Sequence, residues 1–311
     1  MPILSSLPRC LGLLLLLGAL TLSVGTGGEA APTQGTLVIG SISRSIKEEI
    51  ETFRPLADYL RPRLGAAGIR DVKIAVVTNT SEMARRLASG EVDVYIDSPF
   101  IIAQMNRQVG AKPLLRRWKK GLAEYHSLFV AREDSGIRSL DDLRGKVIAF
   151  DDPQSSSGHL LPRAMLLEQG YRLVEVSDPA TASVPADAIG YVFSMDDVNT
   201  MFWVDHGKVA AGVTSPDFLE LYRKKPNDKL VVIARSIDIP RQVVAHRADL
   251  DRVAVAELER VLMAMDSSEE GREALKAFQK TSRFDRFPGG VDATFAPIHA
   301  MLDRLEAPRT N

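Results

Sequence analysis

Short apolar runs alternate with amphipathic segments along most of this chain, and this alternation constrains the fold more than any other feature of the sequence. The apolar runs predict strands at residues 36–40, 72–77, 92–96, 127–131, 147–150, 230–234 and 243–245. Several runs contain almost no polar residue, which is typical of strands covered on both faces. Strands that alternate with helices predict βαβ units and mostly parallel sheets, so we expect an α/β fold.

Helical periodicity fills the intervals between the predicted strands. Phe53, Leu56, Leu60 and Leu64 share one face of a helix, and Pro55 predicts that this helix begins or bends near it. Further helices are predicted within residues 83–87, 99–107, 158–169, 196–206 and 250–265. No glycine-rich dinucleotide fingerprint and no phosphate-loop lysine motif follows a predicted strand, which argues against a nucleotide-dependent enzyme.

Size and charge set further bounds. The chain has 311 residues, 45% of them hydrophobic and 25% charged, a composition typical of a globular protein with a substantial core. Its length predicts two domains of roughly 100–150 residues each. The net charge of −1 gives no field that would favour nucleic acid or a membrane surface. Selectivity for a charged ligand therefore requires a local site.

The N-terminal 31 residues have the pattern of a cleaved secretory signal peptide. Arg9 precedes an apolar run at residues 11–22, and small residues follow up to Pro32. The alternative is an uncleaved anchor, but the run is short for a membrane span. The sequence therefore predicts export to the periplasm. We expect the exported protein to be a monomer. Cys10 is the only cysteine and precedes the expected cleavage point, so we expect no disulfide, thiol chemistry or thiolate metal site in the mature protein.

Residues 151–159, DDPQSSSGH, form a predicted turn from a strand into a helix. The first turn of a helix has unpaired N–H groups and partial positive charge, which suit an anion. Ser155, Ser156 and Ser157 add hydroxyl donors, and Gly158 permits a close approach of a ligand or relaxes the turn. The alternative is that one serine caps the helix and the others belong to the loop.

The sequence also predicts where the residues on either side of the three serines lie. Asp151 and Asp152 would repel an anion, so we expect them to cap the helix or to turn outward. His159 lies in the first helical turn, where it either reaches the ligand or is exposed. No histidine pair has metal-ligand spacing, and the G-x-S-x-G motif of serine hydrolases is absent from the sequence.

The segment at residues 126–170 resembles the periplasmic phosphate-, phosphite- and phosphonate-binding family of ABC transporter solute receptors. It has the family's SGI-x-SL-x-DL-x-GK approach, a strand, D-x-x-S-x-SG, and a proline in the next helix. Residues 53–65, 89–104 and 282–302 resemble other segments of the same family. The resemblance covers residues 36 to about 305, most of the predicted mature chain.

This resemblance implies a type II periplasmic-binding-protein fold, in which two α/β lobes are joined by two crossover strands with a ligand cleft between them. We expect the crossovers at residues 129–132 and 232–236. One lobe is then residues 32–131 with 236–311, and the other is residues 132–235. Closure of two lobes around a small polar solute is a known hinge motion.

The implied function is capture of a small phosphate- or phosphonate-like oxyanion for an ABC permease, with no catalysis, cofactor or metal. The alternative is a receptor of the same fold that binds a different solute or acts as the ligand-sensing partner of a signalling protein. An enzyme on this fold is a third reading, and the predicted signal peptide and the lack of a convincing acid–base pair count against it.

The resemblance also suggests ligand groups beyond the serine turn. Tyr125 stands just before the expected crossover, where an ordinary strand-end aromatic is the alternative. The opposite lobe would contribute Ser43, Arg44 and Ser98 from two strand-end loops. Arg44 can pair with an anion, although a solvated arginine is the plainer reading.

Two positions depart from the family pattern. Met195 stands where the family has a histidine, and Ala210 stands where it has an acid. Both departures argue against an amine-bearing ligand and against tight phosphonate binding. Asp196 is predicted to be a helix cap. The basic run at residues 116–120 is predicted to be a solvated loop, with contact to a membrane partner as the alternative.

Overall fold

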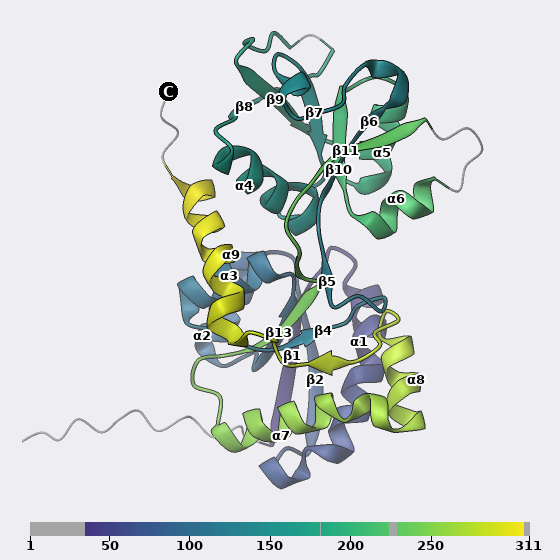
Figure 1. Cartoon of the computed structure of the whole chain (residues 1–311). Coiled ribbons are helices and arrows are strands. Elements are labelled where there is room, and N and C mark those ends of the chain that lie inside the picture. The colour runs from purple at the N-terminus through teal and green to yellow at the C-terminus, as the bar shows by residue number, and fades with distance from the viewer. Residues whose placement is uncertain (1–34, 181, 224–228, 308–311) are drawn as a thin grey trace, which may run out of the picture.

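The computed structural model describes residues 35–180, 182–223 and 229–307, and it has two lobes stacked one above the other (Figure 1). The predicted signal peptide and Cys10 lie outside the described residues. Each lobe is built on a six-stranded sheet. Within the described ranges, no helix is both long and apolar enough to cross a membrane. The predicted two-lobed α/β fold is confirmed.

The first lobe has the strand order β14-β4-β13-β3-β1-β2. Its strands are β1 (Thr36–Ile42), β2 (Asp71–Val77), β3 (Val94–Asp97), β4 (Lys112–Arg117), β13 (Gln242–His246) and β14 (Phe284–Asp285). Its helices are α1 (Ile46–Leu60), α2 (Thr80–Ser89), α3 (Pro99–Val109), α7 (Arg252–Met263), α8 (Glu269–Ala277) and α9 (Gly290–Glu306). Strands β2 and β3 run parallel to β1, whereas β13 runs antiparallel to β3 and β4.

The second lobe has the strand order β11-β6-β10-β7-β9-β8. Its strands are β6 (Leu128–Arg132), β7 (Val147–Phe150), β8 (Arg172–Glu175), β9 (Ala188–Phe193), β10 (Ala211–Thr214) and β11 (Leu230–Arg235). Its helices are α4 (Leu161–Glu168), α5 (Asp197–Asp205) and α6 (Pro216–Tyr222). Both sheets are mixed rather than mostly parallel, because β6 in the second sheet and β13 in the first run antiparallel to the strands on either side of them.

A short two-stranded ribbon connects the lobes. It pairs β5 (Glu124–Tyr125) antiparallel with β12 (Ile239–Pro240), and Tyr125 lies opposite Ile239. The segments expected to cross between the lobes, 129–132 and 232–236, lie instead largely within β6 and β11 of the second sheet. These strands pair with each other along almost their whole length, which draws both of them into that sheet. We therefore place the lobe boundaries at the ribbon.

Every strand predicted from an apolar run is confirmed, with its ends shifted by no more than a few residues. Strands β4, β8, β9 and β10 were missed, and so were the two-residue strands β5, β12 and β14. Strand β4 contains Arg116 and Arg117, the first two residues of the basic run, so the predicted solvated loop is wrong for these two. Arg117 is fully buried in this strand, where it donates to the Thr281 hydroxyl at 2.9 Å and the Phe278 carbonyl at 2.9 Å. Satisfied hydrogen bonds allow a guanidinium to enter a core.

One side of the molecule has a hydrophobic core that both lobes share. Leu160, Leu161 and Ala164 of the second lobe are buried in the same cluster as Met301 and Leu302 of α9. Figure 1 shows α9 rising from the first lobe toward α4, and the two helices are in contact. This packing holds the helix that follows the serine turn against the first lobe.

Candidate functional site

The strand ends of the two lobes face each other across the connecting ribbon. The loop after β1 contributes Arg44, which lies 3.9 Å from Asp152 in the loop after β7. Lys120, in the turn after β4, donates to Asp217 at the start of α6 at 3.0 Å. These two ion pairs join the lobes across the region expected to hold a ligand.

The three serines of the turn have different roles. Ser155 is the helix cap, since its hydroxyl accepts from the Gly158 N–H at 3.1 Å. Ser156 is only 4% exposed, and its Oγ makes no hydrogen bond of normal geometry among the residues that the structure describes. The Ser157 carbonyl accepts from the Ser127 hydroxyl at 2.6 Å, and the Ser157 side chain is hydrogen bonded with Tyr125. The capping alternative therefore holds for one serine of the three.

The helix opens with an unusually wide turn. The Leu160 N–H bonds to the Ser155 carbonyl five residues back, and residues Ser156–Leu160 form a π-helical turn before α4. Such turns are rare and occur frequently at functional sites. Ser156 is the first residue of this π-helical turn, so its hydroxyl lies at the N-terminal end of the helix.

Tyr125 lies beside this turn and is buried. Burial raises the pKa of Tyr125, while Arg241 and hydrogen bonding with Ser156 and Ser157 act in the opposite direction. The phenol therefore stays protonated and can donate. The Arg241 guanidinium lies 4.5 Å from the centre of the Tyr125 ring, a cation–π distance.

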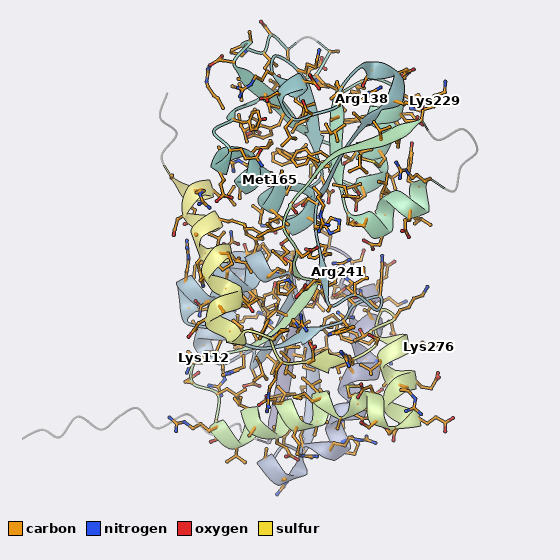
Figure 2. The ribbon with its side chains drawn as sticks, in the orientation of Figure 1. Lys112, Arg138, Met165, Lys229, Arg241 and Lys276 are labelled. Carbon is orange, nitrogen blue, oxygen red and sulfur yellow. The ribbon has the colours of Figure 1, made fainter. Side chains whose placement is uncertain are left out.

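Arg241 was missed by the sequence analysis. Its side chain is 15% exposed and its Nε is buried, with no hydrogen-bond partner in the described ranges. Figure 2 labels it between the lobes, next to the connecting strands. It directly follows the two-residue strand β12, and the pairing of β12 with β5 brings it to Tyr125. The only signal in the sequence was its position just beyond the second expected crossover.

Lys119 adds a second partly buried cation. Burial, together with the charges of Arg117 and Arg241, lowers the pKa of Lys119 to about 8. The opposite charges of Asp97 and Glu49 act in the other direction and lie on the same lobe. Lys119 therefore carries its charge at neutral pH and loses it in mildly alkaline solution.

Asp151 does not turn outward as expected. Burial, and then the nearby charge of Asp197, raise the pKa of Asp151 to about 6. A Cβ atom added at Gly158 would lie 2.4 Å from the Asp151 Cβ and 2.8 Å from the Ser155 Oγ. Glycine is thus required here because the Asp151 side chain packs against the turn. Asp152 does not cap the helix, because Ser155 does so; the Asp152 Oδ1 accepts from the Gln154 N–H at 2.8 Å within the preceding loop.

The other sequence candidates do not join this group. The Ser43 hydroxyl accepts from the Ser45 N–H at 3.1 Å, and Arg44 is 83% exposed on its side chain. The Ser98 hydroxyl makes no capping hydrogen bond at the start of α3. These residues lie on the opposite lobe's loops, as expected, and Arg44 approaches the serine turn at Asp152.

His159 is buried within the second lobe rather than exposed. Its ring packs against Phe150 and Phe193, and Nδ1 lies 2.8 Å from the Pro153 carbonyl. Burial lowers the pKa of His159 to about 4, so the imidazole is neutral at physiological pH. The helix turns this residue toward the aromatic cluster, and we leave it out of the candidate site.

Residues 39–287 match the family described as "ABC transporter, phosphonate, periplasmic substrate-binding protein". The match spans well over half of the chain. The chain belongs to this family. The family is one of binding proteins, in agreement with the expectation that the chain is not an enzyme. Its two lobes have the type II periplasmic-binding-protein fold, also as expected.

Individual relatives support this assignment. The phosphate-import protein PhnD of Mycolicibacterium smegmatis is 29% identical over 143 residues, which cover 43% of this chain and 42% of the relative. The match thus spans less than half the length of that curated relative. XAC2383 from Xanthomonas citri, solved with chloride and with ATP, has a TM-score of 0.80 at 28% identity, over 87% of this chain and 98% of its own.

A third relative agrees at the level of the fold. PhnD1 from Prochlorococcus marinus, solved in complex with methylphosphonate, has a TM-score of 0.63 at 18% identity. The similarity covers 88% of this chain and 99% of that protein.

Met195 and Ala210, the two residues that depart from the phosphonate-binding family pattern, lie in different places in the second lobe. Met195 lies in the turn after β9 with a φ of 72°, a left-handed conformation that is uncommon for methionine. Ala210 lies at the amino-terminal end of β10, where its N–H bonds to the Val147 carbonyl. The serine turn lies at the opposite end of the sheet, so Ala210 does not face it. The expectation that this position shapes the ligand site is wrong, because the direction of β10 turns it away.

The predicted cap at Asp196 is confirmed. Its side chain accepts from the Asn199 N–H at 2.6 Å at the start of α5. The carboxyl end of β10 carries the buried Thr214, which donates to Asp197 at 2.6 Å, followed by Asp217. Acidic groups therefore line the second lobe's side of the site. No group of three potential metal ligands occurs in the described part of the chain.

The crowding of carboxylates predicts a pH-dependent effect of Asp151→Asn. Because the pKa of Asp151 in the folded protein is about 6, above its ordinary value of 3.8, its contribution to stability is present at low pH and is lost as pH rises through 6. We expect the stability of the variant relative to wild type to increase by at most about 3 kcal/mol from low to neutral pH. Urea unfolding at the two ends of this range measures the difference.

Asp152→Asn is the matched control, since it removes the same charge from the neighbouring residue, whose carboxylate lies 3.9 Å from the exposed Arg44. We expect its stability relative to wild type to change much less with pH. A constant offset for Asp151→Asn across the range would contradict the assignment of the raised pKa to Asp151.

Proposed function

We propose that this chain is the periplasmic substrate-binding component of an ABC importer and captures a small phosphate- or phosphonate-like oxyanion between its lobes. The observation that carries the proposal is the convergence of three donors from separate segments. These are the buried Ser156 hydroxyl, the Tyr125 hydroxyl and the Arg241 guanidinium. The family membership and the phosphate-import relative support the same ligand class.

The chemistry of these groups suits a tetrahedral oxyanion. Hydroxyls, a guanidinium and the first turn of a helix all offer hydrogen-bond donors. Charge-assisted hydrogen bonds are stronger than neutral ones, and burial strengthens them further. Lys119 adds positive charge at neutral pH. Binding needs no bond to be made or broken, and neither a cofactor nor a metal.

Delivery of the ligand requires a partner and a motion. The ribbon of β5 and β12 is the narrow connection about which the lobes would open and close. In the closed state both lobes would present one continuous surface to a membrane permease. We expect the exported protein to act as a monomer, because both halves of the donor set come from a single chain.

A different solute is the second candidate. XAC2383, which resembles this chain over most of its length, has been solved with ATP as well as chloride. A ligand panel should therefore include ATP beside the small oxyanions. A receptor that informs a signalling protein would bind its ligand by the same donors, and only the partner would differ.

The serine turn provides the first test. Ser156→Ala removes a donor from an anion, which we expect to weaken oxyanion binding by roughly 10- to 100-fold with little change in stability. Ser155→Ala removes the cap and should lower the free energy of unfolding by about 1 kcal/mol, with a smaller effect on affinity. Calorimetry with phosphate, phosphite, methylphosphonate and sulfate measures the affinities, and thermal unfolding measures the stabilities.

The two variants control for each other. Equal losses of affinity from both would mean that the integrity of the turn, and not the Ser156 hydroxyl, supports binding. If none of the four oxyanions binds to the wild-type protein, the proposed ligand class is wrong.

A further inference from the structure

His159 joins the π-helical turn to the loop that precedes it. Its Nδ1 lies 2.8 Å from the Pro153 carbonyl oxygen, six residues earlier in the chain. A carbonyl oxygen only accepts, so Nδ1 carries a hydrogen and donates it. Proline has no N–H, and the Pro153 carbonyl is therefore the one backbone group through which this residue can be held. The hydrogen bond closes the loop onto the first turn of the helix.

The wide helical turn places the imidazole for this contact. The N–H groups of His159 and Leu160 both bond to the Ser155 carbonyl, at 3.1 and 2.9 Å, so the turn accommodates one extra residue. Side chains of a helix point back toward its N-terminus, which directs His159 toward the loop. All three serines lie between the two ends of the hydrogen bond, so they belong to the segment that it closes.

Aromatic side chains enclose the rest of the ring. The centre of the imidazole lies 5.1 Å from the ring centre of Phe150 and 4.8 Å from that of Phe193, and His159 is only 5% exposed. Its Nε2 is buried and makes no hydrogen bond with a residue that the structure describes. Packing alone would favour phenylalanine, which fills similar space without an unpaired nitrogen. The hydrogen bond of Nδ1 explains why a polar ring lies here.

The surroundings keep the imidazole neutral. Burial lowers the pKa of His159 to about 4. The charge of Arg163 acts in the same direction, whereas Pro153, Glu175 and Asp152 act in the other. A neutral imidazole has a single N–H, and the contact with Pro153 requires that N–H on Nδ1. The donor is therefore fixed in one tautomer at neutral pH.

From this geometry we infer that His159 is a positioning residue of the oxyanion site. Through the Pro153 carbonyl, and without touching the ligand, it holds the loop of residues 151–155. The Ser156 hydroxyl and the first-turn N–H groups are then in place before a ligand arrives. A site that is ordered in advance binds more tightly, because binding does not have to order it. The inference rests on the proposed function.

Two substitutions separate the hydrogen bond from the packing. His159→Phe keeps an aromatic ring but removes the donor, so we expect oxyanion affinity to fall roughly 10-fold without a loss of thermal stability. His159→Asn keeps an N–H donor near the position of Nδ1 but loses most of the ring. We expect it to bind within about threefold of wild type and to melt at a lower temperature. Calorimetry with phosphate, phosphite, methylphosphonate and sulfate, and thermal unfolding, measure both effects.

His206→Phe is the matched control. His206 follows the last residue of α5, where its Nδ1 lies 2.9 Å from the Phe202 carbonyl oxygen and its ring centre lies 3.9 Å from that of Phe202. The substitution therefore removes the same kind of hydrogen bond, beside an aromatic ring, from the same lobe. Because the serine turn is not involved, we expect a change in affinity of less than about threefold.

Two further measurements need no ligand. Deuterium uptake by the segment of residues 151–160 reports whether the loop is held. We expect uptake to be faster than wild type in His159→Phe and unchanged in His159→Asn. In the wild-type protein at neutral pH, the imidazole nitrogen chemical shifts of His159 should be those of the Nδ1–H tautomer. An Nε2–H tautomer would contradict the inference.

The outcomes separate the inference from the proposed function. If the wild-type protein binds none of the four oxyanions, the proposed function fails, and deuterium uptake alone then decides whether His159 holds the loop. If oxyanions bind but His159→Phe keeps the wild-type affinity or the wild-type uptake, the inference alone is overturned. Equal losses of affinity from His159→Phe and His159→Asn would also overturn it, since packing and not the hydrogen bond would then support the turn.

Discussion

Replacing Arg241 with glutamine is expected to lower the affinity for the oxyanion by about 100-fold or more. The guanidinium is the buried cation that stacks on Tyr125, and the hydroxyl of that ring lies beside Ser156 and Ser157. Its loss removes both a charge and directed donors from a site with little water to replace them. Calorimetry with the tightest-binding oxyanion measures the affinity. Thermal unfolding checks that the variant is folded, since the backbone N–H of residue 241 still bonds to the Ala123 carbonyl.

Arg44→Gln is the matched control for this prediction. Arg44 was a candidate anion ligand from the sequence, with a solvated arginine as the plainer reading, and its side chain is 83% exposed and lies 3.9 Å from Asp152. Exposed ion pairs contribute little, so we expect a change in affinity of less than about threefold. A larger loss from Arg44→Gln than from Arg241→Gln would show that the anion site lies at the loop after β1.

Replacing Gly158 with alanine should destabilise the second lobe by about 3 kcal/mol and weaken ligand binding with it. The added Cβ would lie 2.4 Å from the Asp151 Cβ, so either the wide helical turn or the loop after β7 must move. Any such movement displaces the Ser156 hydroxyl. Urea unfolding measures the stability, and calorimetry measures the affinity.

Gly65→Ala is a suitable comparison. A methyl group added at Gly65 would have open space around it, with no atom within 4 Å, and the backbone there is not left-handed. We expect this variant to match the wild-type protein in stability within about 0.5 kcal/mol. If Gly158→Ala were equally harmless, the packing of Asp151 against the turn would not be a constraint on the site.

The local pattern of the chain determined much of the fold. Apolar runs predicted the strands they form because a strand covered on both faces needs apolar side chains throughout. The strand β4 was missed because its arginines look solvated in isolation, and only their partners elsewhere in the chain allow burial. The ends of the crossing segments were misplaced because strand pairing, and not composition, decides which sheet a strand joins.

The candidate site likewise has features that the local sequence could predict and features that it could not. The serine turn could be located from sequence because helix capping and first-turn donors are local properties, which depend on residues only a few positions apart. Local spacing could not say which serine would cap, nor that Asp151 would pack against Gly158.

The sequence by itself determined a two-lobed α/β protein with a donor-rich turn at a strand end. The tertiary structure alone decided what faces that turn. Arg241 reaches Tyr125 because β12 pairs with β5, which lies more than 100 positions earlier in the chain. The direction of β10 turns Ala210 away and brings Asp217 to Lys120. Charges become partners only when distant segments meet, because electrostatic and hydrogen-bond contacts act over a few ångströms and spacing along the chain does not report them.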